Sequence, residues 1–117
     1  MARMVRGGLI QCSNPINDET RKVSEIQAAA LEKHLPFVHE AGKRGVQMLC
    51  LQEIFNGPYF CPSQSARWYD AAEPVPGPTT EVFMPIAKQH RMVIVVPEYN
   101  HGFAGRLMQV LDCHREE

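Results

Sequence analysis

An apolar run that stops at a carboxylate constrains this chain more than any other feature. Residues Val46 to Leu51 are almost all apolar, they follow the helix-stop signal Lys43-Arg44-Gly45, and Glu53 comes just after them. Such a run, bounded by turn residues, is typical of a buried strand in an α/β sheet. Open α/β sheets place their ligands at the carboxyl ends of the strands, so Glu53 lies where a functional group is expected.

The loop after this strand supplies aromatic residues that can enclose the carboxylate. Phe55, Tyr59 and Phe60 follow Glu53 closely, among Gly and Pro residues. Burial beside these rings favours a carboxylate that accepts a proton near neutral pH and acts as a general base. The spacing alone leaves a second interpretation open, in which Glu53 caps a loop or pairs with an arginine.

The other patterns along the chain predict an α/β fold. Val5 to Cys12 is a first apolar run, Glu19 to Lys43 has the periodicity of a helix, and Met92 to Val96 is a β-branched third run. A second helix is expected to begin with Thr79 as its cap. The predicted order is therefore strand, helix, strand, long loop, helix, strand and tail. The predicted inward-facing residues are Val23, Ile26, Ala30, Val38 and Ala41 in the first helix, and Val82, Phe83, Ile86 and Ala87 in the second.

Two prolines lie inside the predicted helices. Pro36 removes a backbone donor and crowds the carbonyl of Glu32, so the first helix is expected to kink or divide there. Pro85 is likewise an interior proline of the second helix and lacks a backbone donor. Both prolines are expected to weaken these helices.

Composition and charge exclude several classes of function. The chain has 117 residues, a formal net charge of -1 and 44% hydrophobic residues, which is enough for one modest core. Its basic residues are scattered among acids, so nucleic acid is not expected as a ligand. The sequence has no run of about 18 apolar residues, and its amino terminus lacks a secretory pattern. We therefore expect no membrane partner and a cytoplasmic location.

The four cysteines do not form a metal-binding pattern. Cys12, Cys50, Cys61 and Cys113 show neither a CxxC pair nor a zinc-type spacing with the five histidines. We expect reduced thiols and no metal site. Cys113 and His114 contain a nucleophile and a base, but adjacent residues on a strand point to opposite faces, which disfavours the pair.

Two further side chains stand at informative positions. Glu98 ends the third apolar run as Glu53 ends the second, and it is a candidate supporting carboxylate of the same site. Trp68 follows a polar stretch of the long loop and is expected to anchor that loop.

Four segments together resemble one enzyme family. They are Val5 to Gln11, Leu51 to Cys61, Gly77 to Thr80 and Met92 to Pro97. In this order they resemble the amino-terminal part of the nitrilase, or carbon-nitrogen hydrolase, superfamily. Within it the likeness is greatest to the β-ureidopropionase and N-carbamoyl amidohydrolase branch. The resemblance runs from about residue 4 to residue 99, and it covers only the front part of such an enzyme.

The resemblance implies an α/β fold of a particular kind and a particular chemistry. It implies an incomplete nitrilase-like α-β-β-α sandwich and a Glu-Lys-Cys triad, in which the glutamate is the general base, the lysine steadies the oxyanion and the cysteine attacks. Glu53 matches the glutamate, whereas the lysine and the nucleophilic cysteine have no matching position. Tyr59 and Phe60 would bind the substrate's acyl part, although aromatic residues beside a sheet are also common in cores. Cys61 is disfavoured as the nucleophile, and no metal or organic cofactor is implied.

The resemblance also suggests a boundary and a function. We expect residues 1–100 to be the amino-terminal part of a carbon-nitrogen hydrolase domain and residues 101–117 to be a divergent tail of a truncated or frameshifted product. The complete enzyme would cleave N-carbamoyl (ureido) or amide C-N bonds of small molecules and could form a homo-oligomer, while this chain alone would be inactive. The alternative is a noncatalytic interaction module or a nonfunctional product.

Overall fold

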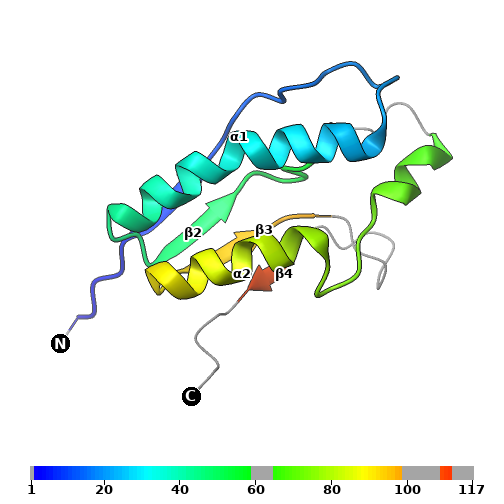
Figure 1. Ribbon diagram of the computed structural model, residues 1–117. Coiled ribbons are helices and arrows are strands. Elements are labelled where there is room, and N and C mark those ends of the chain that lie inside the picture. The colour runs from blue at the N-terminus through cyan, green and yellow to red at the C-terminus, as the bar shows by residue number, and fades with distance from the viewer. Residues whose placement is uncertain (1, 59–64, 99–108, 112–117) are drawn as a thin grey trace.

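The described part of the chain is a sheet with two helices on one face. The computed structural model describes residues 2–58, 65–98 and 109–111. Helices α1 (Val23–Lys43) and α2 (Pro78–His90) lie side by side over the same face of the sheet (Figure 1). Two packed layers of this kind place one hydrophobic core between them.

The three predicted apolar runs form neighbouring parallel strands. They are β1 (Gly7–Ile10), β2 (Met48–Leu51) and β3 (Val93–Val96), with β2 pairing in parallel to both of the others. The predicted α/β fold class is confirmed, and each strand is shorter than the run that predicted it. Parallel strands joined through helices carry their carboxyl ends to one edge of the sheet.

A fourth strand lies where only a tail was predicted. β4 (Gln109–Leu111) pairs antiparallel with β3, so the strand order is β1-β2-β3-β4. Residues 101–108 and 112–117 of the predicted tail lie outside the described residues. The antiparallel partner protects the β3 edge of the sheet.

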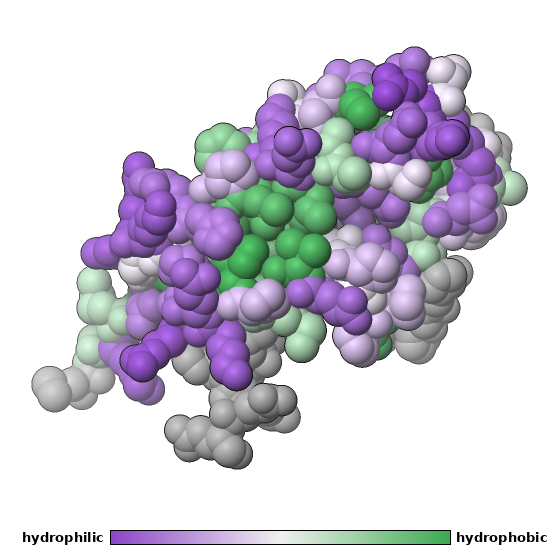
Figure 2. Space-filling model, viewed as in Figure 1, coloured by the Kyte–Doolittle hydropathy of each residue, from purple (hydrophilic) through white to green (hydrophobic). Residues whose placement is uncertain are grey.

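Side chains alternate between the two faces of the sheet along each strand, and only one of these faces is covered by the helices. Leu49 and Ile94 are buried beneath the helices, whereas Leu9 is 86% exposed and Met48 is 52% exposed on the other face. Figure 2 shows the helical side, where apolar surface between α1 and α2 is ringed by polar side chains. An apolar sheet face without a covering layer is typical of a surface that contacts another layer in a larger structure. The core consists of Val38, Ala41, Val46, Leu49, Leu51, Phe55, Phe83, Ile86, Ala87, Met92, Ile94 and Val96.

Both interior prolines are accommodated without breaking their helices. α1 continues through Pro36 and α2 continues through Pro85. The prediction was a kink or a division at Pro36, and the division is wrong because α1 is one continuous helix. Pro36, Pro85 and Glu32 all lie at exposed positions, so water can reach the carbonyl of Glu32 that has lost its helical donor.

A left-handed glycine ends α1 and leads directly into β2. Gly45 has a φ of 74°. Its N–H donates to the Gly42 carbonyl, and the Val46 N–H donates to the Ala41 carbonyl. This arrangement satisfies the last carbonyl groups of the helix and fixes where the chain enters the sheet.

The start of α2 differs from the predicted cap. Gly77, not Thr79, is the N-cap residue, and its N–H donates to Oγ1 of Thr80 at 2.7 Å. Thr79 lies inside the first turn, where its N–H and its hydroxyl each donate to the Glu73 carboxylate at 2.8 Å. A carboxylate at this position is favourable because the amino terminus of a helix carries partial positive charge.

The predicted inward-facing stripes are largely confirmed. Val23 and Val82 are only half-buried, and His34, Thr79 and Thr80 are buried although they were not predicted to be. His34 is tolerated because Nδ1 of its ring is 2.7 Å from the Ala30 carbonyl one helical turn earlier.

Candidate functional site

Glu53 lies just beyond the carboxyl end of β2, as predicted. Its side chain is exposed. The residue before it, Gln52, accepts a hydrogen bond through Oε1 from the Cys12 N–H, which ties the end of β2 to the segment that follows β1. A strand end held in this way gives the neighbouring carboxylate a defined position at the edge of the sheet.

The backbone turns sharply immediately after Glu53. Ile54 has a φ of 50°, a left-handed conformation that β-branched residues rarely adopt. Its side chain is buried, and its carbonyl accepts a hydrogen bond from the Gly57 N–H at 3.2 Å. Strain of this kind costs on the order of 1–3 kcal/mol and clusters at functional sites. The turn directs the chain away from β2 and leaves Glu53 at the edge.

Phe55 was predicted to help enclose Glu53, but it does not line the site. It is fully buried and makes edge-to-face contacts with His34 and Phe83, at centroid distances of 5.2 and 5.6 Å. The ring anchors the loop after β2 in the core between the sheet and both helices. Sequence spacing missed this because three consecutive residues after Glu53, namely Ile54, Phe55 and Asn56, are all buried.

Replacing Phe55 with Ala should destabilise the protein by about 3–5 kcal/mol, because the change removes a fully buried ring and leaves a cavity between three elements. Urea unfolding followed by circular dichroism measures the loss. A matched Phe37→Ala change, at a site that is 50% exposed on α1, should have a much smaller effect. Equal losses in the two variants would contradict the anchoring role.

Several other predicted site residues lie outside the described residues. They are Tyr59, Phe60 and Cys61 after β2, and Cys113 and His114 in the tail. Cys12 and Cys50, the cysteines within the described ranges, are free and half-buried, as predicted for reduced thiols. Trp68 is buried in the short 3-10 helix η2 (Ala66–Ala71), where it anchors the long loop as predicted.

Glu98 is the more unusual carboxyl group of the two strand ends. It follows β3, it is completely buried, and neither of its oxygens has a hydrogen-bond partner among the described residues. Burial, together with the nearby charge of Glu73, raises the pKa of Glu98 to about 7. Buried carboxyl groups without donors favour the neutral acid because ionisation in a desolvated site is costly.

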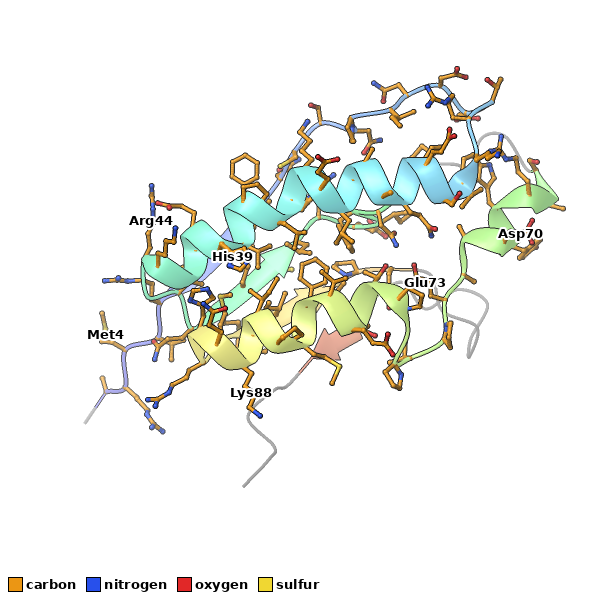
Figure 3. The ribbon with its side chains drawn as sticks, viewed as in Figure 1. Met4, His39, Arg44, Asp70, Glu73 and Lys88 are labelled. Carbon is orange, nitrogen blue, oxygen red and sulfur yellow. The ribbon has the colours of Figure 1, made fainter. Side chains whose placement is uncertain are left out.

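The register of the sheet relates Glu98 to Glu53. Cys50 on β2 pairs with Val95 on β3, and each glutamate stands three residues after its member of this pair. Both carboxyl groups therefore belong to the same edge of two adjacent parallel strands. Glu73 lies at this end of the molecule as well, where α2 begins (Figure 3). Sequence position suggested the pairing of Glu53 with Glu98, but burial of only one of them could not be predicted from it.

Glu98 should lower the stability of the protein at neutral and alkaline pH. The unfolded chain ionises this group near its ordinary pKa of 4.5, whereas the folded protein keeps the proton up to about pH 7. The contribution of Glu98 to the free energy of unfolding is therefore most favourable below pH 4.5, and it is lost as the pH rises to 7. Glu98→Gln should raise the free energy of unfolding at pH 8 by on the order of 3 kcal/mol. Urea titrations at pH 5 and pH 8 test this, and a gain that is equal at both values would contradict it.

A small cavity lies beside the turn after β2. Its volume is about 10 Å³, and its lining includes Ile26, Ile54, Asn56 and Trp68. This is room for roughly one water molecule, not for a substrate. The Asn56 amide nitrogen is buried without a hydrogen-bond partner in the described part of the chain, and a water in this cavity is a suitable acceptor for it.

The described residues place limits on other kinds of site. Within residues 2–58, 65–98 and 109–111, no three or more His, Cys, Asp or Glu side chains are grouped so that they can hold a metal ion. No helix in the same ranges is long and apolar enough to cross a membrane.

Comparison with known proteins gives a consistent result. Residues 8–108 match the sequence profile of the family described as carbon-nitrogen hydrolase. A β-ureidopropionase from Arabidopsis thaliana is 37% identical over 86% of this chain, and an omega-amidase NIT2 from Bos taurus is 32% identical over 69% of it. An N-carbamoylputrescine amidase from Oryza sativa subsp. japonica is 31% identical over 62% of the chain.

The matches cover only part of each relative. They span 25% of the β-ureidopropionase, 29% of the omega-amidase and 25% of the N-carbamoylputrescine amidase. The chain therefore spans about a quarter of the length of the curated relatives it matches.

Proposed function

This chain belongs to the carbon-nitrogen hydrolase family, and from that premise we propose that it supplies the general-base glutamate of an enzyme that cleaves N-carbamoyl or amide C-N bonds. The observation that carries the proposal is the position of Glu53 at the carboxyl end of a strand, followed by a strained turn. Glu53 also matches the position of the glutamate in the family resemblance. We call the chain, together with the part of its relatives' length that it does not span, the complete hydrolase domain.

In the proposed mechanism Glu53 takes the proton of the nucleophilic cysteine thiol. The thiolate attacks the planar carbon of the amide or ureido group, and a lysine and backbone N–H donors stabilise the resulting oxyanion. Each such donor is worth about 3 kcal/mol in the transition state. Glu53 gives the thiol proton to the leaving ammonia or amine as the C–N bond breaks, an acyl-enzyme remains, and the ionised Glu53 then takes a proton from the water that hydrolyses it. The lysine and the cysteine come from the remaining part of the domain.

We propose N-carbamoyl compounds as the substrate class. Two of the three relatives described above are named for carbamoyl substrates, and the relative that covers most of this chain is a β-ureidopropionase. With such a substrate the products are an amino acid such as β-alanine, carbon dioxide and ammonia. Tyr59 and Phe60 are proposed to line the pocket for the part of the substrate that becomes this amino acid.

The exposed face of the sheet fits this proposal. Leu9 and Met48 are apolar and open to solvent on the face that the helices do not cover. In the proposed complete domain a second sheet packs against this face and completes the α-β-β-α sandwich. The same surface also supports the second candidate function, a noncatalytic module that docks on complete subunits of the enzyme through this face. The division into residues 1–100 and a tail of residues 101–117 is part of the first proposal.

The substrate class can be tested with product measurements on the complete hydrolase domain. Incubation with N-carbamoyl-β-alanine should release ammonia and carbon dioxide in equal amounts, whereas a terminal amide releases ammonia alone. Faster release from the carbamoyl compound is the expected result. Turnover of the amide alone would contradict the substrate class. If neither compound is turned over and this chain binds to complete subunits of the enzyme, the noncatalytic docking module would be favoured.

A further inference from the structure

Glu98 lies at the same edge of the sheet as Glu53. Glu98 is fully buried, its two oxygens have no partner among the described residues, and it stands at the register position that matches Glu53. An ionised carboxylate in such a place lacks both water and donors. The neutral acid is better tolerated there, because it carries no charge that needs solvation.

Glu73 adds a second reason for Glu98 to keep its proton. The Glu73 carboxylate is held at the start of α2 by two hydrogen bonds from Thr79. Among the described residues, Glu73 is the ionisable group whose charge acts on Glu98, and its effect adds to that of burial. Like charges close together favour protonation of one of them. Burial is the larger of the two effects that favour the proton on Glu98.

We propose that Glu98 is a positioning residue of the hydrolase site, where it acts as an uncharged, proton-carrying carboxyl group. This inference rests on the proposed function of Glu53. Glu53 is ionised before it takes the thiol proton, and the cysteine is a thiolate afterwards, so one negative charge is present at this edge in both states. An ionised Glu98 would add a buried negative charge that repels it in both states. With its proton, Glu98 adds no negative charge to this edge and does not oppose the ionised base or the thiolate.

The dependence of kcat on pH in the complete hydrolase domain tests the proposal. The wild-type rate should fall by about tenfold per pH unit once Glu98 ionises, above about pH 7. Glu98→Gln replaces the acid with an amide that cannot ionise, so this fall should disappear from its profile. A merely structural Glu98 would change the height of the profile and leave the alkaline fall in place.

A second variant keeps the test decisive if Glu98→Gln folds poorly. Glu73→Gln removes the neighbouring charge and should move the alkaline fall to lower pH, because Glu98 then ionises more easily. Glu81→Gln is the matched control, since Glu81 is an exposed acid in the first turn of α2. Its profile should equal that of the wild type. Equal shifts in the two variants, or no shift in either, would overturn the proposal.

Infrared spectroscopy separates this inference from the proposed function. A protonated carboxyl group has its own C=O stretching band, which should be present at pH 6, disappear as the pH rises past about 7, and be missing in Glu98→Gln. A wild-type spectrum without this band at pH 6 would overturn the inference even if the enzyme is active. An inactive enzyme that retains the band would refute the proposed function and the positioning role, and would leave only the protonation of Glu98.

Discussion

Replacing Glu53 with Gln in the complete hydrolase domain should lower kcat by on the order of a hundredfold or more. Glutamine has nearly the same shape as glutamate but cannot accept the thiol proton, so the thiolate no longer forms in the active site. Because the Glu53 side chain is exposed, the change should leave the unfolding midpoint almost unchanged. Steady-state ammonia release and thermal unfolding of the same preparation measure the two effects.

A suitable control replaces a carboxylate that is remote from the strand ends. Glu32 is exposed in the middle of α1, and Glu32→Gln should leave both kcat and stability within error of the wild type. A well-folded Glu53→Gln protein with near-normal kcat would remove Glu53 from the mechanism. A large loss of stability in that variant would instead support the structural interpretation, in which Glu53 holds a loop.

The 117-residue polypeptide by itself should release no ammonia from N-carbamoyl-β-alanine or N-carbamoylputrescine above an enzyme-free blank. In the proposed function the lysine and the nucleophilic cysteine come from outside this chain. Members of a catalytic triad act as a unit, so the base alone would give no covalent route. The expected effect is a complete loss relative to the complete domain, measured at equal molar concentration.

Two cysteine variants control for an unexpected nucleophile in the short polypeptide. Cys61 follows the aromatic residues after Glu53, and Cys113 stands next to His114. Turnover by the wild-type polypeptide that disappears in Cys61→Ala or in Cys113→Ala would assign the nucleophile to this chain. That result would contradict the division of the active site between this chain and the remaining part of the domain.

The apolar runs predicted the sheet well because strands with apolar residues on both faces give continuous hydrophobic sequence. β2 and β3 lie inside the predicted runs, and the carboxyl end of β2 places Glu53 where the pattern put it. The β4 strand at residues 109–111 was not predicted, because three residues in a mixed sequence give no periodicity, and their pairing depends on β3 rather than on their own pattern.

Local rules failed where tertiary contacts decide the structure. Pro36 predicts a break, yet packing of α1 on the sheet stabilises one continuous helix with the proline on its exposed side. Thr79 has the chemistry of a cap, but the Glu73 carboxylate six residues earlier takes the first-turn donors instead. Such a partner cannot be identified from the sequence around Thr79 alone.

In the candidate site, too, the sequence pattern predicts the position of a residue, whereas tertiary packing decides whether its side chain is buried. A glutamate after a buried strand is visible in the sequence, for both Glu53 and Glu98. Whether its side chain faces water depends on the turn that follows and on the loops packed around it. For that reason the sequence pointed to an enclosed Glu53, whereas Glu53 is exposed and Glu98 is the buried one.

The central claim is that Glu53 generates the thiolate that attacks the substrate. The complete hydrolase domain is mixed with N-carbamoyl-β-alanine and quenched in acid within the first turnover. Mass spectrometry of the intact protein then measures the acyl-enzyme directly. The wild type should accumulate this adduct, and Glu53→Gln should form it on the order of a hundredfold more slowly. Formation of the adduct at the wild-type rate in Glu53→Gln would contradict the claim.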